Sequence, residues 1–373
     1  MPKEEKRMSR TTLPQRYYTD PGIFETELEK FYFGSWICVG RASEIPKPGD
    51  YFLREIGKES IVIVRGEDEV VRAFFNVCLH RGTRICTIAE GRFAGRIQCG
   101  YHGWTYSLDG MLIAAPHMEE PDFCRENYPL HGIAAEIWDG HVFVNVESEA
   151  GPLAAQLGDL REKFSPWGVG ELRMAARKTY DVRCNWKLLV VNYNECLHCP
   201  ILHPLLNRMT HYLSGTNDPP AQAYIGGSMN FREGVKTMSV QGNRTRACLP
   251  GLTGEDRERV LYYTVYPNLF LSLHPDYVMT HTLWPQAVDQ TQVICELHFH
   301  PHEMKKPDFD PSDAVTFWDT TNREDWRICE LSQLGIQSRA YQPGPYSAKE
   351  GLPQAFDEMI MGSAGDQHTE DGK

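Results

Sequence analysis

Two short stretches decide the first part of the fold: CLHRG at residues 78–82 and CGYHGW at residues 99–104. Each contains one cysteine, one histidine and at least one glycine, and each lies beside a β-rich run. Glycine permits the tight backbone turns that bring the side chains of a short loop together. The pattern therefore predicts two loops, each of which presents one thiol and one imidazole to a common centre.

The four candidate ligands are Cys78, His80, Cys99 and His102. Two thiolates and two imidazoles form tetrahedral zinc sites. The same set holds a [2Fe–2S] cluster that has both cysteines on one iron and both histidines on the other. Because each loop supplies one ligand of each kind, two parallel loops would hold a cluster from both sides. The spacing favours the cluster, with zinc and a chance grouping of buried side chains as the alternatives.

Short β-rich runs surround these loops at residues 51–54, 60–65, 70–76 and 140–146. Turns rich in glycine and proline separate the runs, which is typical of consecutive antiparallel strands. They predict a small all-β domain over residues 37–150.

The rest of the chain predicts a larger domain of strands and helices. Residues 1–36 are expected to form an arm and a helix that begins at Pro21, a favoured first helical residue, and to pack on that domain. The larger domain is expected over residues 151–373, with a helix at 311–337 and a polar tail after about residue 362.

Composition narrows the class of protein. The chain has 373 residues, enough for two or three domains, and its net charge is 38 − 50 = −12. An acidic balance argues against a nucleic-acid partner, and no apolar run predicts an export signal or a membrane span. We therefore expect a cytoplasmic protein.

The cysteines are interpreted in the same way. In a reducing compartment, the 11 cysteines are expected to be ligands or buried thiols rather than disulfides. Cys196 and Cys199 have C-x-x-C spacing, but the βαβ pattern of thioredoxin-like redox sites is missing around them.

A second dense stretch, NYNECLHCPILHP, ends the helix predicted over residues 185–198. Glu195 and His198 are three residues apart and so share one helix face. His203 lies five residues further on, and Pro200 is expected to break the helix and turn His203 back toward the same centre. Two histidines and a carboxylate form the facial triad of non-haem Fe(II) sites. The alternative is a pair of structural histidines beside a helix end.

Together, these motifs resemble those of Rieske non-haem iron oxygenases, and the resemblance runs from about Tyr18 to Phe356. It implies an α+β fold with a small all-β Rieske domain. The larger catalytic domain would have an antiparallel sheet covered by helices, the helix-grip or START-like arrangement. The four ligands named above would hold the [2Fe–2S] cluster.

The same resemblance implies roles for the second stretch. His198 and His203 would bind a mononuclear non-haem Fe(II), and Glu195 would link this iron to the Rieske histidine of a neighbouring subunit. In this family the third iron ligand comes from a late helix. The expected residue is Asp325, with Glu324 as the alternative.

The expected reaction needs an external source of electrons. O₂ chemistry at the iron would consume two electrons, and the chain has no glycine-rich dinucleotide motif of its own. We expect a separate NAD(P)H-dependent reductase of the flavin or ferredoxin type to supply them to the Rieske centre. The resemblance further implies a head-to-tail homotrimer.

Several late residues resemble the branch that oxidises or N-demethylates quaternary ammonium compounds such as choline, glycine betaine, carnitine and stachydrine. A small betaine-type substrate is therefore favoured over an aromatic ring or acid, and a Rieske electron carrier without oxygenase activity is the remote alternative. Five aromatic residues of the second domain are candidates for cation–π contacts to a methylammonium, or for sheet packing. The branch residues are Gln333, Ser338, Tyr341, Gly344 and Tyr346, and the aromatic candidates are Tyr262, Tyr263, Tyr266, Tyr277 and Trp284.

Overall fold

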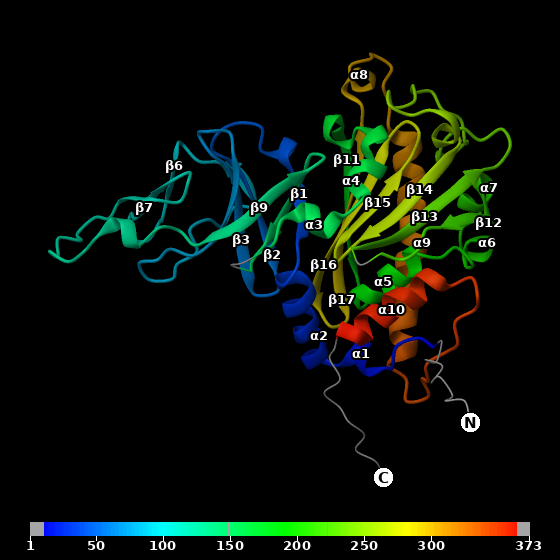
Figure 1. Ribbon diagram of the computed structural model, residues 1–373, viewed down its shortest axis with the longest axis horizontal. Coiled ribbons are helices and arrows are strands. Elements are labelled where there is room, and N and C mark those ends of the chain that lie inside the picture. The colour runs from blue at the N-terminus through cyan, green and yellow to red at the C-terminus, as the bar shows by residue number, and fades with distance from the viewer. Residues whose placement is uncertain (1–10, 148–149, 222, 364–373) are drawn as a thin grey trace, which may run out of the picture. The chain divides into compact units, whose positions relative to one another are not determined.

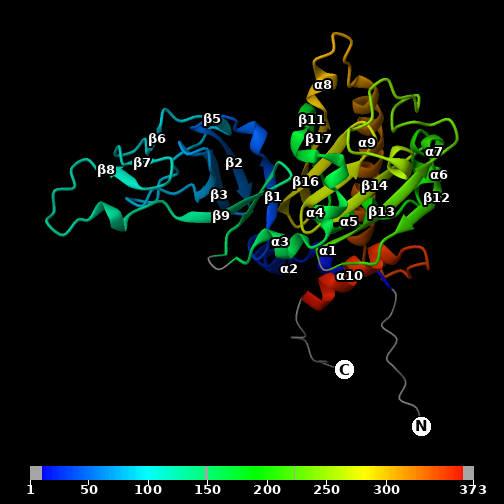
Figure 2. The same cartoon turned by 45° about the horizontal axis from the view of Figure 1, so that its top comes forward.

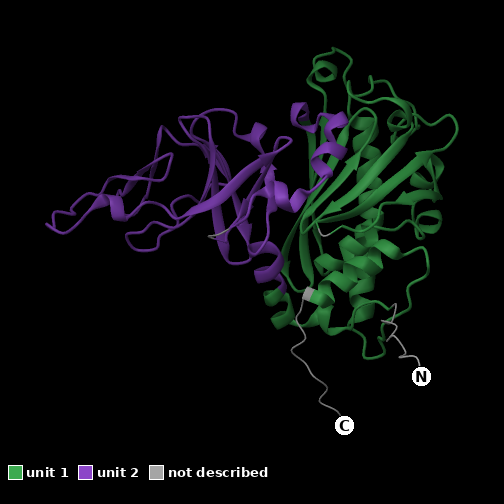
Figure 3. Cartoon of the chain, viewed as in Figure 1, with its two compact units in different colours: residues 1–26, 174–373 green, residues 27–173 purple. Residues whose placement is uncertain are grey.

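The computed structural model describes residues 11–147, 150–221 and 223–363. The described chain forms two compact units, coloured separately in Figure 3. The smaller unit spans residues 27–173, and the larger unit combines the N-terminal residues up to 26 with those from 174 onward. None of the helices in these ranges is long and apolar enough to cross a membrane.

The smaller unit contains two antiparallel sheets. One has seven strands in the order β1-β10-β9-β4-β3-β2-β5, and the other has the order β6-β7-β8. The first candidate ligand loop follows β4, and the second connects β6 to β7. The strands are β1 (Ile37–Arg41), β2 (Asp50–Ile56), β3 (Glu59–Arg65), β4 (Val71–Phe75), β5 (Glu90–Arg92), β6 (Arg96–Gln98), β7 (Thr105–Ser107), β8 (Leu112–Ala114), β9 (Gly132–Trp138) and β10 (His141–Asn145).

Residues 151–173, which were predicted to lie in the second domain, belong to the smaller unit. Their backbone is tied to it, since the guanidinium of Arg41 donates to the Val169 carbonyl at 2.7 Å and Gly170 N donates to the Asp139 carboxylate at 2.6 Å. The segment contains α3 (Leu153–Leu157), α4 (Leu160–Lys163) and the 3-10 helices η4 (Ser165–Trp167) and η5 (Val169–Glu171).

The larger unit is an antiparallel sheet with helices against it, which confirms the expected α+β class. Its strand order is β11-β17-β16-β15-β14-β13-β12, and Figures 1 and 2 show the long helix α9 running along this sheet. The strands are β11 (Arg173–Val182), β12 (Thr210–Asn217), β13 (Tyr224–Phe231), β14 (Arg259–Val265), β15 (Leu269–Leu273), β16 (Val278–Ala287) and β17 (Gln290–Phe299). The helices after the smaller unit are α5 (Trp186–Tyr193), α6 (Cys199–Leu202), α7 (Leu206–Met209), α8 (Pro301–Met304), α9 (Ser312–Ile336) and α10 (Gly351–Ser363).

Helix α9 confirms the helix predicted over residues 311–337. Its buried residues recur every three or four positions, which is the spacing of one helical face. That face carries Phe317, Trp318, Thr321 and Trp326, so α9 has a fixed rotation about its own axis. This rotation fixes the direction of the two acidic side chains that lie between Thr321 and Trp326.

The N-terminal segment is held by the end of the chain. Helix α2 (Pro21–Glu27) begins at the predicted proline and follows α1 (Arg16–Thr19), and the π-helix η1 (Leu28–Phe33) comes next. The buried Gln333 side chain donates to the Tyr18 carbonyl at 3.1 Å, and the Tyr341 hydroxyl donates to the Leu13 carbonyl at 2.9 Å. Two of the residues that pointed to a substrate branch therefore have structural roles.

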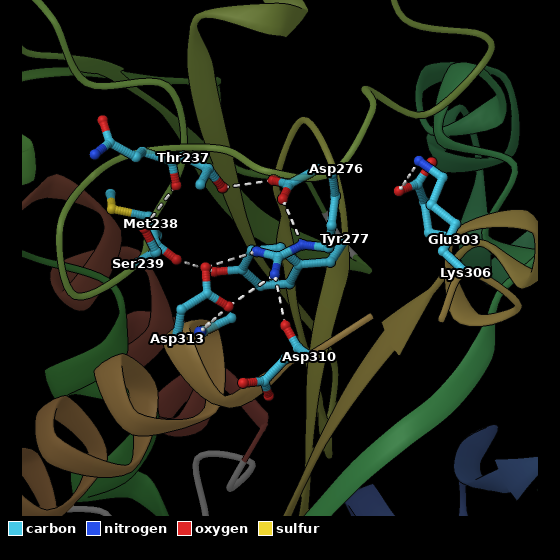
Figure 4. Close-up of polar contacts among 12 residues, drawn as sticks. Thr237, Met238, Ser239, Asp276, Tyr277, Glu303, Lys306, Asp310 and Asp313 are labelled. Atoms are coloured by element: carbon cyan, nitrogen blue, oxygen red, sulfur yellow. Dashed lines mark hydrogen bonds and ion pairs between the residues drawn. The ribbon is translucent and has the colours of Figure 1, made fainter. Parts of the chain in front are cut away.

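A buried ionic cluster fixes the start of α9 (Figure 4). The Arg246 guanidinium contacts Asp276 at 2.9 Å and Asp313 of α9 at 2.7 Å. Thr237 donates its hydroxyl to Asp276 as well, at 2.5 Å. The Asp276 side chain is fully buried and that of Arg246 is 4% exposed. Burial raises the pKa of Asp276, and Arg246 opposes this effect. The carboxylate therefore depends on its partners to keep its negative charge.

We expect Arg246→Ala to destabilise the larger unit by about 3–5 kcal/mol, because it leaves a buried carboxylate without its cation. Urea denaturation followed by tryptophan fluorescence measures this loss. The control is Arg72→Ala, which removes an exposed ion pair with Asp68 and should cost at most about 1 kcal/mol. Equal losses from the two variants would contradict the assignment of Arg246 as a buried structural cation.

Candidate functional site

The two Cys/His loops of the smaller unit converge. Cys78 and Cys99 are buried at 1% and 3% exposure and belong to one cluster of buried residues, in which Cys99 contributes to raising the pKa of Cys78. The imidazole rings of His80 and His102 meet edge to face, with centroids 4.5 Å apart. Sulfur thus pairs with sulfur, and imidazole pairs with imidazole, even though each loop supplies one of each. This pairing fits a [2Fe–2S] cluster with cysteines on one iron and histidines on the other.

Neighbouring aromatic side chains hold these loops. The Tyr106 hydroxyl lies 3.5 Å from Cys78 Sγ and accepts a hydrogen bond from Leu79 N at 3.2 Å. The His80 ring stacks on buried Trp104 at a centroid distance of 4.9 Å. Burial raises the pKa of Cys78, so this thiol keeps its proton at neutral pH unless a metal ion displaces it.

The second stretch begins where helix α5 ends. The sequence predicted a helix to His198, but α5 stops at Tyr193. The reason is the Asn194 side chain, whose amide donates to the Val190 carbonyl at 2.7 Å and to Thr264 at 2.8 Å. This side chain takes the place of the next backbone donor, so the helix ends there.

The short helix α6, and not a helix break at Pro200, brings the two histidines together. His198 is the residue before α6 and His203 is the residue after it, while Pro200 lies inside the first turn of α6, where proline is tolerated. Their rings lie 5.2 Å apart. The two imidazoles converge as expected. The expected reason, a helix break at Pro200, is wrong.

Asp325 on α9 completes a three-residue group. Its Oδ1 atom lies 2.8 Å from His203 Nε2 and 3.5 Å from His198 Nε2. All three residues line one cavity. Two imidazoles and one carboxylate that converge beside a cavity fit a 2-His-1-carboxylate metal site with open positions.

Each of the two histidines has another carboxylate at its opposite nitrogen. Glu195 Oε1 lies 2.5 Å from His198 Nδ1, and Glu324 Oε2 lies 2.7 Å from His203 Nδ1. Asp325 faces both Nε2 atoms, whereas Glu324 contacts only His203. The geometry thus separates the two candidates for third ligand, and it favours Asp325.

The electrostatics of the group favour a cation. Burial lowers the pKa of His198, but hydrogen bonds to Asp325 and Glu195 outweigh burial and raise it to about 9. Asp325 likewise outweighs burial and raises the pKa of His203. Burial raises the pKa of Asp325 itself, and the two histidines lower it overall. The three carboxylates therefore stabilise positive charge on and beside the imidazoles, whether a proton or a bound cation carries it.

The cysteines in this stretch differ from the expectation. Cys196 and Cys199 form a disulfide, whereas thiols were predicted. The tight turn places their Cα atoms 5.0 Å apart, within the range that a disulfide spans. Donor atoms of His198, Cys199 and His203 also lie within 4.8 Å of one another. The Cys199 sulfur is bonded to Cys196, whereas Asp325 Oδ1 faces the Nε2 atoms of both histidines.

The cavity beside the group has a volume of about 330 Å³. Of the five aromatic candidates from the sequence, Tyr262 is the one that lines it; Tyr277, for example, is buried and donates its hydroxyl to the Met238 carbonyl at 2.6 Å. The sequence missed three further aromatic walls, because they come from α5, β12 and α9, far apart in the chain. The aromatic walls are Tyr193, Tyr212, Tyr262 and Trp318.

Three features define the class of protein. The larger unit has a sheet with a long helix along it and a 2-His-1-carboxylate group beside a cavity, and the separate β-rich unit has paired Cys/His loops. Together they are typical of an oxygenase of the Rieske non-haem iron class. Family comparison agrees. Residues 35–133 match the Rieske [2Fe-2S] domain, and residues 169–363 match the ring hydroxylating alpha subunit (catalytic domain). The chain belongs to the family of ring-hydroxylating oxygenase alpha subunits and is an oxidoreductase.

Relatives of known activity cover nearly the whole chain. The glycine betaine monooxygenase oxygenase subunit of Chromohalobacter salexigens is 32% identical over 90% of this chain and 82% of its own length. The carnitine monooxygenase oxygenase subunit of Escherichia coli K12 is 32% identical over 89% of this chain and 86% of its own. The crystal structure of the quaternary ammonium Rieske monooxygenase CntA with L-carnitine matches 95% of this chain and 96% of its own, with TM-score 0.80 and 26% identity.

Proposed function

We propose that this protein is the oxygenase component that hydroxylates, and thereby N-demethylates, a small quaternary ammonium compound of the betaine type. The observation that carries the proposal is the convergence of His198, His203 and Asp325 on the wall of a cavity with four aromatic side chains. In this proposal these three residues hold a mononuclear Fe(II). Cys78, His80, Cys99 and His102 hold the [2Fe–2S] cluster.

The proposed reaction balances when O₂ and two electrons are supplied from outside the protein. The substrate, one O₂, two electrons and two protons give one water and a hydroxylated N-methyl group. That N–CH₂OH group then loses formaldehyde and a proton, which leaves a tertiary amine. When bound, the mononuclear iron supplies the O₂ chemistry and the Rieske cluster passes on electrons one at a time. An NAD(P)H-dependent reductase of the flavin or ferredoxin type is the proposed electron source.

The residues of this chain contribute position and charge. Glu195 holds His198 from its Nδ1 side and also accepts a hydrogen bond from Leu197 N, so its carboxylate is fixed at the edge of the iron site. We propose that it also contacts the Rieske histidine of a neighbouring subunit in a head-to-tail homotrimer. Inter-subunit electron transfer is described for a structurally similar quaternary ammonium Rieske monooxygenase, which is 25% identical to this chain with TM-score 0.80.

The cavity walls support a methylammonium substrate. The Tyr262 ring lies 6.1 Å from Tyr193 and 6.4 Å from Trp318 by centroids, each nearly perpendicular to it. Aromatic faces at different angles attract a methylated cation through their quadrupoles. The carboxylates of Glu195 and Asp325 line the same cavity and add negative potential. Cation attraction and the named activities of the relatives thus point to the same substrate class.

The substrate class has a direct test. The purified protein, with a Rieske reductase and NADH, is given glycine betaine, carnitine, stachydrine or choline, and formaldehyde is measured. We expect formaldehyde from at least one betaine, at one molecule per O₂ consumed when turnover is fully coupled. A Tyr262→Leu variant should raise KM for that substrate, because a desolvated cation–π contact is worth about 2 kcal/mol, or about thirtyfold.

The control for this test is an arene of similar size. Turnover of the arene together with no turnover of any quaternary ammonium compound would contradict the proposed substrate and favour aromatic hydroxylation. The same outcome would leave the two iron sites standing. No O₂ consumption with any substrate, in a protein with both metal sites loaded and reduced, would favour an electron carrier instead.

A further inference from the structure

The two histidines of the proposed iron site are held in the same way by different elements. His198 has Glu195 at its Nδ1 atom, from the turn after α5, and His203 has Glu324 at its Nδ1 atom, from α9. The role proposed for Glu195 is electron transfer between subunits. Glu324 has no role in the function proposed above, although its contact with a histidine is equally direct.

The His203 ring is almost completely enclosed, with 1% of its side chain exposed. One ring nitrogen contacts Glu324 at 2.7 Å and the other contacts Asp325 at 2.8 Å. These two carboxylates are adjacent on α9, so a single helix contacts both edges of the ring. Little of the His203 ring is therefore open to solvent, and its two nitrogens are occupied by protein partners.

A neutral imidazole donates from one nitrogen and accepts at the other, and the acceptor on one side decides which nitrogen carries the proton. His203 has a carboxylate at each ring nitrogen, so without a metal either one can accept a ring proton. A metal at Nε2 leaves a single ring proton, on Nδ1, and Glu324 is the group that accepts it. The lone pair of Nε2 then faces Asp325 and His198, where a metal ligand must point. A carboxylate partner also makes the imidazole a stronger base and therefore a better ligand.

We propose that Glu324 is a positioning residue that fixes the ring orientation and the tautomer of His203 and so sets the metal affinity of the site. The inference rests on the assignment of His198, His203 and Asp325 as iron ligands made above. It separates the two glutamates by function. Glu195 would serve electron transfer as well as position, whereas Glu324, whose side chain is 30% exposed, would serve metal retention alone.

The experiment measures metal retention in the full-length protein. Each variant is loaded with Fe(II) without oxygen and then challenged with a chelator, and the iron lost from the mononuclear site is followed over time. Rieske absorption serves as the internal standard for protein amount, and urea denaturation followed by tryptophan fluorescence reports folding of the larger unit. The variants are Glu324→Leu, which removes the acceptor, Glu324→Gln, which keeps a neutral acceptor, and His203→Ala, which removes the proposed ligand.

The matched control is Glu330→Gln. Glu330 lies on the same helix, is also half-buried and accepts a hydrogen bond from Arg183 N at 3.1 Å, away from the cavity. We expect Glu324→Leu to lower the affinity for Fe(II) about 10- to 100-fold. Glu324→Gln should lower it less, and Glu330→Gln should leave it unchanged.

Two outcomes would overturn different parts of the proposal. If His203→Ala releases iron and Glu324→Leu retains it like the wild type, the positioning role is wrong and the iron site stands. If His203→Ala also retains iron, the ligand assignment itself is wrong. Should Glu324→Leu lack the urea denaturation transition of a folded protein, Glu324→Ala takes its place, and equal retention by Glu324→Ala and Glu330→Gln overturns the proposal.

Discussion

Replacing His198 with alanine is expected to abolish oxygenation while the Rieske absorption spectrum stays unchanged. His198 contributes one of the three donor groups of the proposed Fe(II) site, and its side chain lies in the larger unit, whereas the Cys/His loops lie in the smaller one. Losing one of three ligands removes the metal and with it the whole of the O₂ chemistry. Turnover should fall below detection, and iron should fall from about three atoms per chain to about two.

The measurement combines product formation, an iron count and the visible spectrum on one sample. The matched control is His302→Ala, because the His302 side chain is 77% exposed and lies on α8, outside the cavity. That variant should keep full activity and full iron. Substantial activity in His198→Ala would show that the iron lies elsewhere, and loss of the Rieske spectrum would show that the substitution had disturbed more than one site.

Replacing Glu195 with glutamine is expected to slow turnover about 10- to 100-fold, the usual cost of losing a carboxylate behind a metal-bound histidine. Glutamine keeps the size of the side chain and can still accept a hydrogen bond from His198, so the loss reports on charge. If Glu195 also links two subunits, the specific defect is slow electron transfer from the Rieske centre. Reduction of that centre by the reductase should proceed at the normal rate.

A single-turnover experiment separates these steps. Protein with both centres reduced is mixed with O₂ and substrate, and the return of the oxidised Rieske absorption is timed. In Glu195→Gln this return should be slow, whereas in Glu324→Gln it should match the wild type once iron is loaded. Reoxidation of the Glu195→Gln Rieske centre at the wild-type rate would contradict the bridging role.

Much of the chemistry was readable from short spacings. Cys78 and His80 are two residues apart, Cys99 and His102 are three apart, and His198 and His203 are five apart. Side chains this close along the chain have few ways to point, so residue type and spacing carry most of the information. The helix over residues 311–337 was equally predictable, because its buried face repeats at the helical period.

Local pattern failed where a side chain competed with the backbone. The helix predicted to reach His198 ends at Tyr193, because the Asn194 amide bonds the Val190 carbonyl and Thr264 on a distant strand. The disulfide between Cys196 and Cys199 depends on the turn that follows this helix end. Helix propensity and hydrophobic periodicity predict neither the side-chain hydrogen bonds nor the disulfide. Both contacts depend on where the chain turns.

The sequence by itself determined which residue types meet at the two centres, and it predicted that a separate reductase supplies the electrons. The tertiary structure decided which acidic residue faces the histidines. Asp325 and Glu324 are neighbours of the same charge, 122 and 121 residues from His203, and only the rotation of α9 puts one at Nε2 and the other at Nδ1. That rotation is set by packing of the buried face of α9 against the sheet, a long-range contact that spacing along the chain does not encode.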